Sequence, residues 1–260
     1  FTTMEYRNGI IIQQQTNILD FKKEDAFIDI DNAIVNKILE PIKSILNSDV
    51  KIIIAIDAPL SFSKNFRQLI ERRINLNAFS NLKKNNSIAF RTTEIIINNE
   101  FKDCLSAVFD SIGNPSTLAQ VVMLKLKALG FKYLPIDSID YYQNNKDDNK
   151  IIIEVYPGVL RGREYYKETQ AVEMNEKFKS KNYEACIKYY SDLNSGSKPK
   201  SLEMDEFDSI LCSLLGLSFA KSFYGDKSND IPLLEMETRI DSKYVADAAQ
   251  EGWIYYPKFI

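Results

Sequence analysis

The run Val50–Ile56 constrains the fold more than any other segment of this chain. It ends in five consecutive apolar residues, four of them isoleucine, so it offers no polar face to solvent. A strand of this kind is covered on both sides, as happens in a sheet that has helices on both faces. Ile151–Tyr156 repeats the pattern and predicts a second buried strand. Together the two runs indicate an α/β protein.

Weaker patterns predict the elements around these two strands. Gly9–Thr16 and Ala26–Ile30 are expected to form early strands, the first one after an Arg-Asn-Gly turn signal. A helix is expected to follow the cap residue Asp31, with an interruption at Pro41. Further helices are expected at Pro115–Leu129, Thr169–Ser191 and Leu202–Phe223. We therefore expect one domain over residues 1–260, with a mixed sheet flanked by helices.

The residue types present narrow the possible chemistry. The 260 residues include no histidine, which excludes Ser-His-Asp and Cys-His catalysis and any metal site with histidine ligands. The three cysteines are far apart in sequence and form no CxxC pair, which argues against a disulfide scaffold and against a zinc site. The remaining metal ligands are carboxylates, which prefer hard cations such as Mg²⁺ or Mn²⁺.

The sequence also bears on where the protein works. No apolar run approaches the roughly 18 residues that span a membrane. The start, Phe1-Thr2-Thr3-Met4, is not a signal peptide. We expect a cytoplasmic protein with no membrane partner. Because the sequence does not begin with methionine, we also expect further residues upstream of Phe1.

Charge is distributed unevenly along the chain. Residues 61–93 contain seven lysines or arginines and one acid, whereas residues 201–241 contain nine acids and three bases. A basic segment facing an acidic one is what a protein needs to bind a phosphate backbone beside a metal site. We therefore expect a basic, mostly helical insertion at about 61–112, in which Arg72 and Arg73 contact nucleic acid. Solvated faces of opposite sign are the alternative.

Two acids end or interrupt the predicted buried strands. Asp57 follows the five apolar residues directly, at the carboxyl end of a strand, where open α/β sheets bind their ligands. Glu154 lies inside the second apolar run, where a carboxylate is costly to bury unless it is paired or bound to a cation. Both are candidate catalytic residues and metal ligands. A turn role for Asp57, and an ion pair of Glu154 with Arg161 or Arg163, are the structural alternatives.

Two further acids, Asp205 and Asp208, lie three residues apart in a predicted helix and therefore on one face of it. Like charges at this spacing repel each other, and a cation between the helix and the strand ends would relieve that repulsion. Acids in the first turn of a helix also stabilise its dipole, which explains Asp205 better than Asp208. Both are candidate metal ligands, and Asp208 is also a candidate catalytic residue.

A polar cluster, Arg91-Thr92-Thr93-Glu94, follows the basic segment. Arg91 is suited to hold a phosphate group or to orient a carboxylate, and a surface ion pair is the alternative. Near the end of the chain, Trp253 and Tyr255 are expected to pack in the core or at a subunit interface. The Glu251-Gly252 step before them is expected to form a loop at the site.

These segments together resemble a family of predicted ribonuclease H-like nucleases, the domain of unknown function 429 (DUF429). The pieces that match are short, and it is their order and combination over about residues 50–257 that is specific. They are Ile56-Asp57-Ala58-Pro59-Leu60, Arg91-Thr92-Thr93-Glu94, Glu154-Val155-Tyr156-Pro157, Asp205-Glu206-Phe207-Asp208 and Glu251-Gly252-Trp253-Ile254-Tyr255-Tyr256-Pro257.

The resemblance implies a mixed five-stranded sheet of three antiparallel strands followed by two parallel ones. It further implies two Mg²⁺ or Mn²⁺ ions, held by carboxylates from the first strand, the fourth strand and the last helix, that cleave a phosphodiester bond. Asp57 then takes the fourth-strand role, Asp208 with Asp205 the helix role, and Glu154 is an additional acid on the fifth strand. The insertion follows the fourth strand. The first strand and its acid are missing from this sequence or truncated at Phe1.

Two other functions remain open at this stage. The chain could be a catalytically silent ribonuclease H-like module that binds nucleic acid or a partner protein in a larger assembly, or forms a homo-oligomer. A phosphotransferase of the actin and sugar-kinase branch would need glycine-rich phosphate turns, which the sequence lacks.

Overall fold

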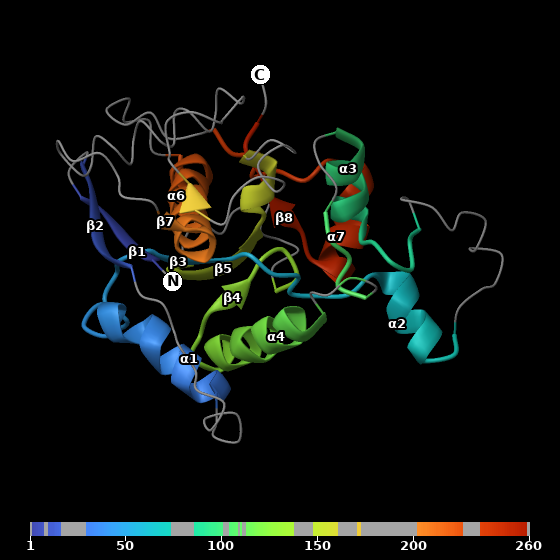
Figure 1. Ribbon diagram of the computed structural model, residues 1–260, viewed down its shortest axis with the longest axis horizontal. Helices are drawn as coiled ribbons and strands as arrows, with labels where there is room; N and C mark the ends of the chain where they lie inside the picture. The colour runs from blue at the N-terminus through green and yellow to red at the C-terminus, as the bar shows by residue number, and fades with distance from the viewer. Residues whose placement is uncertain are drawn as a thin grey trace.

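A computed structural model gives the fold of the chain as a mixed α/β arrangement (Figure 1). The structure describes residues 2–7, 10–16, 30–73, 86–100, 104–108, 110, 113–137, 148–160, 171–172, 202–225 and 235–258. Its centre is a small open parallel sheet with helices on both faces. The prediction of an α/β protein is therefore confirmed.

The sheet is built around β5 (Lys150–Val155). On one side β3 (Ile52–Ile56) runs parallel to it, and Ile56 pairs with Glu154. On the other side β4 (Lys132–Tyr133) pairs with the first half of β5, and β8 (Ile254–Tyr255) with the second half. Both of these pairings are parallel, so the four strands share one direction and their carboxyl ends meet at one edge of the sheet.

Side chains alternate between the two faces of the sheet, as they must in a strand. From β5, Ile151, Ile153 and Val155 enter one apolar core, which also receives Ile53 and Ala55 of β3. Ile152 enters a second core on the opposite face, together with the even-numbered isoleucines of β3. The apolar runs found in the sequence thus supply both cores of the molecule.

Helices cover the two faces, as Figure 1 shows. The long helix α6 (Met204–Tyr224) lies on the first face, where Gly216 lets it approach the side chains of Ala55 and Ile53. Helices α1 (Ile30–Leu39) and α4 (Gly113–Ala128) lie on the second face and pack against each other. Within the described residues, no helix is both long and apolar enough to cross a membrane.

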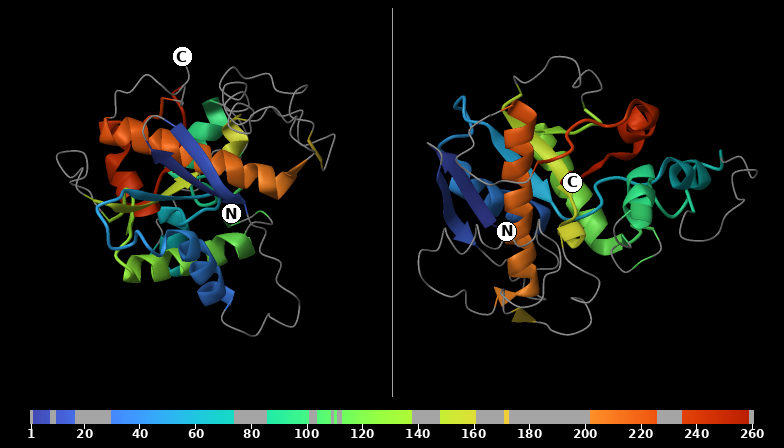
Figure 2. Two further views of the ribbon diagram at one scale, coloured as in Figure 1. Left: turned by 90° about the vertical axis from the view of Figure 1, so that its left-hand side faces the viewer. Right: turned by 90° about the horizontal axis from the view of Figure 1, so that it is seen from above.

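The remaining elements lie at opposite ends of the molecule (Figure 2). A hairpin of β1 (Thr2–Arg7) and β2 (Ile10–Thr16) packs beside α6 at one end. Helices α2 (Lys64–Ile70), α3 (Thr92–Glu100) and α7 (Val245–Glu251) pack together at the other.

The short elements are η2 (Glu40–Ile42), η5 (Pro157–Leu160), η7 (Ser242–Tyr244) and the antiparallel pair β6 (Ala171–Val172) with β7 (Leu202–Glu203).

The structure corrects three local expectations. Ile30 begins α1 instead of ending a strand, and the rest of Ala26–Ile30 lies outside the described residues. Ala171 and Val172 form a strand where a helix was expected, because they pair with β7. The residues of β3 after Ile52 are only partly buried, since β3 has β5 on one side and no other described strand pairs with it.

Gly252 ends α7 in a conformation that requires glycine. Its φ of 76° and ψ of −178° lie in a region that residues with a Cβ rarely occupy. A Cβ at this position would also overlap the hydroxyl group of Tyr133. Gly130 shares the positive φ, at 91°, but has open space around it.

Alanine substitutions at Gly130 and Gly252 therefore allow the cost of backbone strain to be compared with the cost of steric overlap. We expect Gly130→Ala to lower the free energy of unfolding by about 1 kcal/mol, from strain alone. Gly252→Ala should cost about 1–3 kcal/mol more, because Tyr133 is buried and must move. Urea denaturation of both variants measures the difference. Equal losses would show that Tyr133 does not pack against Gly252 as described.

Candidate functional site

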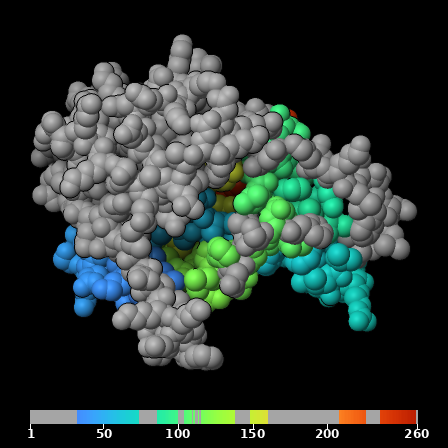
Figure 3. Space-filling view, viewed as in Figure 1, coloured from blue at the N-terminus to red at the C-terminus, as the bar shows by residue number. Residues whose placement is uncertain are grey.

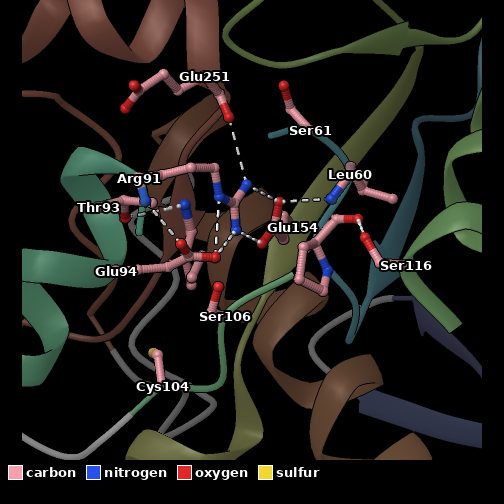
Figure 4. Close-up of polar contacts among 12 residues, drawn as sticks. Leu60, Ser61, Arg91, Thr93, Glu94, Cys104, Ser106, Ser116, Glu154 and Glu251 are labelled. Atoms are coloured by element: carbon pink, nitrogen blue, oxygen red, sulfur yellow. Dashed lines mark hydrogen bonds and ion pairs between the residues drawn. The ribbon is translucent and has the colours of Figure 1, made fainter. Parts of the chain in front are cut away.

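A buried cluster of charged side chains lies where the sheet meets the α2, α3 and α7 group, and Arg91 is its centre (Figure 4). The Arg91 side chain is 1% exposed, and those of Glu94 and Glu154 are each 2% exposed. The guanidinium group donates to Glu94 from Nε at 3.0 Å and from Nη2 at 2.7 Å. It donates to the two oxygens of Glu154 at 2.5 and 2.8 Å. Arg91 thus holds both oxygens of Glu154 in fork geometry and one oxygen of Glu94 through two N–H groups.

Glu94 is placed by the start of α3. Arg91 precedes the helix, and its backbone N–H donates to the Glu94 carboxylate at 2.8 Å. A glutamate three residues after the cap position commonly accepts this N–H, as in a capping box. The same carboxylate also binds the Arg91 side chain. The local sequence Arg91-Thr92-Thr93-Glu94 therefore both caps the start of α3 and holds the Arg91 side chain.

Glu154 is placed by β5 and holds the turn that follows β3. Its Oε2 accepts the backbone N–H of Leu60 at 3.1 Å and the hydroxyl of Tyr133 at 3.3 Å, besides the Arg91 bond. Ser116 of α4 holds the turn from its other side, because its hydroxyl donates to the carbonyl of Pro59 at 2.8 Å. The turn after Asp57 is therefore fixed from two elements.

Glu251 connects α7 with the two neighbouring helices. One of its carboxylate oxygens accepts the N–H of Lys64 at 2.7 Å, and the other accepts the N–H of Thr92 at 2.8 Å. These are free N–H groups at the starts of α2 and α3, where a negative charge is favourable. The backbone carbonyl of Glu251 also accepts a bond from Arg91 at 3.3 Å. Arg91 thereby reaches the helix group as well as the sheet.

Burial and charge shift the ionisation of the cluster. Burial raises the pKa of Glu94, and Arg91 offsets only part of that effect. Burial also raises the pKa of Tyr133, and the charge of Glu154 adds to it. For Arg91, burial opposes the charged form, but Glu154 and Glu94 outweigh burial and raise its pKa further. The cluster therefore keeps its arginine charged and binds a proton on Glu94 more tightly than an exposed glutamate would.

Asp57 and Asp208 lie in a different setting. Asp57 is exposed and follows β3 at its carboxyl end. Asp208 lies near the start of α6, and α6 runs antiparallel to the strands. This direction follows from Tyr224 at the far end of α6, whose hydroxyl donates to the carbonyl of Asp148 just before β5. The start of α6 therefore lies toward the carboxyl ends of β3 and β5, as does η5, which contacts α6.

The other predicted site residues are placed as follows. Asp205 lies in the first turn of α6, and its side chain is outside the described residues. Arg72 and Arg73 are exposed just after α2, and Arg73 pairs with Glu71 at 3.5 Å. Among the described residues, no three acidic or cysteine side chains come together in a group that could hold a metal ion. Figure 3 shows a hollow in the surface above α4. Atoms from the end of β3 and from the C-terminal part of the chain are visible inside it.

The sequence pointed to part of this cluster. It predicted that Arg91 holds a phosphate group or orients a carboxylate, and the structure shows Arg91 bound to carboxylates in a buried position. For Glu154 it predicted a catalytic and metal-binding role, with an ion pair to Arg161 or Arg163 as the structural alternative. Glu154 does form an ion pair, but with Arg91, and Arg161 and Arg163 lie outside the described residues. Tyr133 and Ser116 were missed, because neither the two-residue strand β4 nor a serine in a helix carries a sequence signal of its own.

Comparison of the chain with protein-family models, with curated proteins and with solved structures gives no match.

The cluster predicts a large effect on stability from a single substitution. Arg91→Leu leaves two buried carboxylates without their cation, so we expect the free energy of unfolding to fall by about 3–5 kcal/mol. Arg73→Leu is the matched control, because the Arg73 side chain is 77% exposed and its pair with Glu71 should contribute less than about 1 kcal/mol. Urea denaturation gives both values. Similar losses in the two variants would contradict the buried position of Arg91.

The raised pKa of Glu94 predicts a pH dependence. The unfolded chain releases this proton near the ordinary value of 4.5, whereas the folded protein holds it to a higher pH. Between the two pKa values the folded protein binds more protons, so the Glu94 contribution to stability falls as the pH rises. In Glu94→Gln the free energy of unfolding should therefore decline less over this range. Glu40→Gln, at an exposed glutamate, should keep the wild-type slope. An unchanged slope in Glu94→Gln would contradict the assignment.

Proposed function

We propose that the protein is a Mg²⁺- or Mn²⁺-dependent nuclease of ribonuclease H-like fold that cleaves phosphodiester bonds in DNA or RNA. The observation that carries the proposal is the position of Asp57 and Asp208. Asp57 ends β3, and Asp208 lies near the start of the helix that runs antiparallel over β3 and β5. Acids at the carboxyl ends of parallel strands lie where such sheets bind their ligands.

The arrangement of elements agrees with this fold at a coarse level. Two neighbouring parallel strands, an antiparallel hairpin and a late helix that contacts both are present. The complete ribonuclease H-like sheet, with a further strand beside the hairpin, belongs to the proposal. In that fold the first strand would supply another acid to the cation site.

The donors fit a hard cation by their chemistry, since they are carboxylates. Asp57 and Asp208 would hold the cation, and the side chain of Asp205 on the same helix would complete the set. A bound Mg²⁺ or Mn²⁺ would lower the pKa of a water molecule and so help to supply the nucleophile at neutral pH. Without a metal, a chain that has no histidine would need a carboxylate or lysine of strongly shifted pKa as the general base. The exposed Arg72 and Arg73 would contact the phosphate backbone of the substrate.

One observation favours the second candidate, a catalytically silent module that binds nucleic acid or a protein partner. Both carboxylate oxygens of Glu154 are occupied by hydrogen bonds within the protein. Glu154 is therefore left out of the cation site proposed here, although the resemblance implied that it belongs to that site. The nuclease proposal then depends on Asp57, Asp208 and Asp205.

The cleavage of labelled DNA and RNA, single-stranded and duplex, by the full-length protein tests the proposal. We expect cleavage with Mg²⁺ or Mn²⁺, none with EDTA, and a loss of at least about 100-fold in Asp57→Asn and Asp208→Asn. Each asparagine keeps the shape of the side chain but removes its charge, so the variants should fold normally.

Asp49→Asn is the matched control. Asp49 is an exposed acid near the opposite end of β3, so this variant should cleave like the wild type. Cleavage that persists in EDTA would exclude the metal mechanism. No cleavage of any of the four substrates would favour the silent module.

A further inference from the structure

We propose that Glu154, together with Arg91, is a positioning residue that holds the Asp57–Leu60 turn and thereby sets the Asp57 carboxylate at the cation site. The inference rests on the proposed function, because it assigns Asp57 to that site. It replaces the direct metal-binding role that the sequence suggested for Glu154.

Glu154 contacts the turn directly. Glu154 Oε2 accepts the N–H of Leu60 at 3.1 Å, three residues after Asp57. Leu60 is buried, as is Pro59, whereas Asp57 itself is exposed. Glu154 thus anchors the turn at its buried end, and the other end, with the exposed Asp57, continues directly from β3.

Glu154 and Asp57 lie on different faces of the sheet. Glu154 bonds to Tyr133 and to the backbone of Leu60, and both of these residues belong to the core on the α1 and α4 face. Asp57 continues the odd-numbered positions Ile53 and Ala55, which face α6. Glu154 therefore acts on Asp57 from the opposite side of the sheet, through the turn.

Arg91 holds the Glu154 carboxylate in place. Arg91 occupies both of its oxygens, and Arg91 is itself held by Glu94 and by the carbonyl of Glu251. A carboxylate fixed in this way cannot move toward a cation without breaking two hydrogen bonds of the buried Arg91 guanidinium group. It is, however, well suited to hold a backbone N–H in one place. Mutation of a group that orients a metal ligand commonly lowers metal affinity by about 10–100-fold.

Ser116 offers an independent test, because it holds the same turn without any charge. Its fully buried hydroxyl donates to the carbonyl of Pro59. If the position of the turn matters, Ser116→Ala and Glu154→Gln should act alike. Ser222→Ala is the matched control, because Ser222 bonds the backbone N–H of Met236 near the other end of α6.

The experiment measures two quantities in each variant. The first is the affinity for Mn²⁺ alone, by electron paramagnetic resonance of the free ion. The second is the hydrogen exchange of the backbone amides of Asp57, Ala58, Leu60 and Ser61. We expect Glu154→Gln and Ser116→Ala to bind Mn²⁺ about 10-fold more weakly and to exchange faster in the turn. Ser222→Ala should match the wild type in both.

Three results would separate the possibilities. Loss of Mn²⁺ binding in Glu154→Gln with wild-type binding in Ser116→Ala would show that Glu154 is a ligand and overturn the positioning role. Unchanged exchange in the turn of both variants would also overturn it. Wild-type protein that binds no Mn²⁺ would overturn the proposed function, and faster exchange in the two variants would then still support the hold on the turn.

Discussion

The structure depends on one buried ion cluster, in which the guanidinium group of Arg91 binds Glu94 and Glu154. A charged group removed from water is costly unless its partners satisfy it fully. Here the partners come from α3 and β5, and the backbone of α7 supplies a third. The cost of burying Arg91 is offset only when these elements are correctly placed, so the cluster specifies how the helix group docks on the sheet.

The same cluster links the core to the acids of the proposed cation site. Glu154 lies on a buried strand but bonds the turn after β3, and this turn carries Asp57 to the surface. Asp208 approaches the same end of the sheet on α6, because that helix runs antiparallel to the strands. The molecule therefore combines a buried charge cluster, centred on Arg91, with a second set of acids, Asp57 and Asp208, toward the carboxyl ends of the strands. The proposed cation chemistry uses only the second set.

The parts that sequence could predict are those with a strong local pattern. The apolar runs of β3 and β5 and the late helix α6 follow from periodicity, and the acids at their ends drew attention because they interrupt that pattern. The partner of Glu154 could not be predicted, because Arg91 lies 63 residues away and the pairing depends on tertiary packing. The two-residue strands β4 and β8 carry no periodicity, so the roles of Tyr133 and Gly252 became visible only in the structure.

A double-mutant cycle between Arg91 and Glu154 tests most directly whether this pair specifies the docking. The free energy of unfolding would be measured for Arg91→Leu, Glu154→Leu and the double variant by urea denaturation. Each single variant breaks the Arg91–Glu154 pair and leaves one of its charges buried, whereas the double variant removes both charges of the pair. Glu94 loses Arg91 in Arg91→Leu and in the double variant alike, so that loss cancels in the cycle. We expect the double variant to be more stable than the sum of the single losses implies, with a coupling of about 2 kcal/mol or more. Additive losses would contradict a direct buried interaction between Arg91 and Glu154.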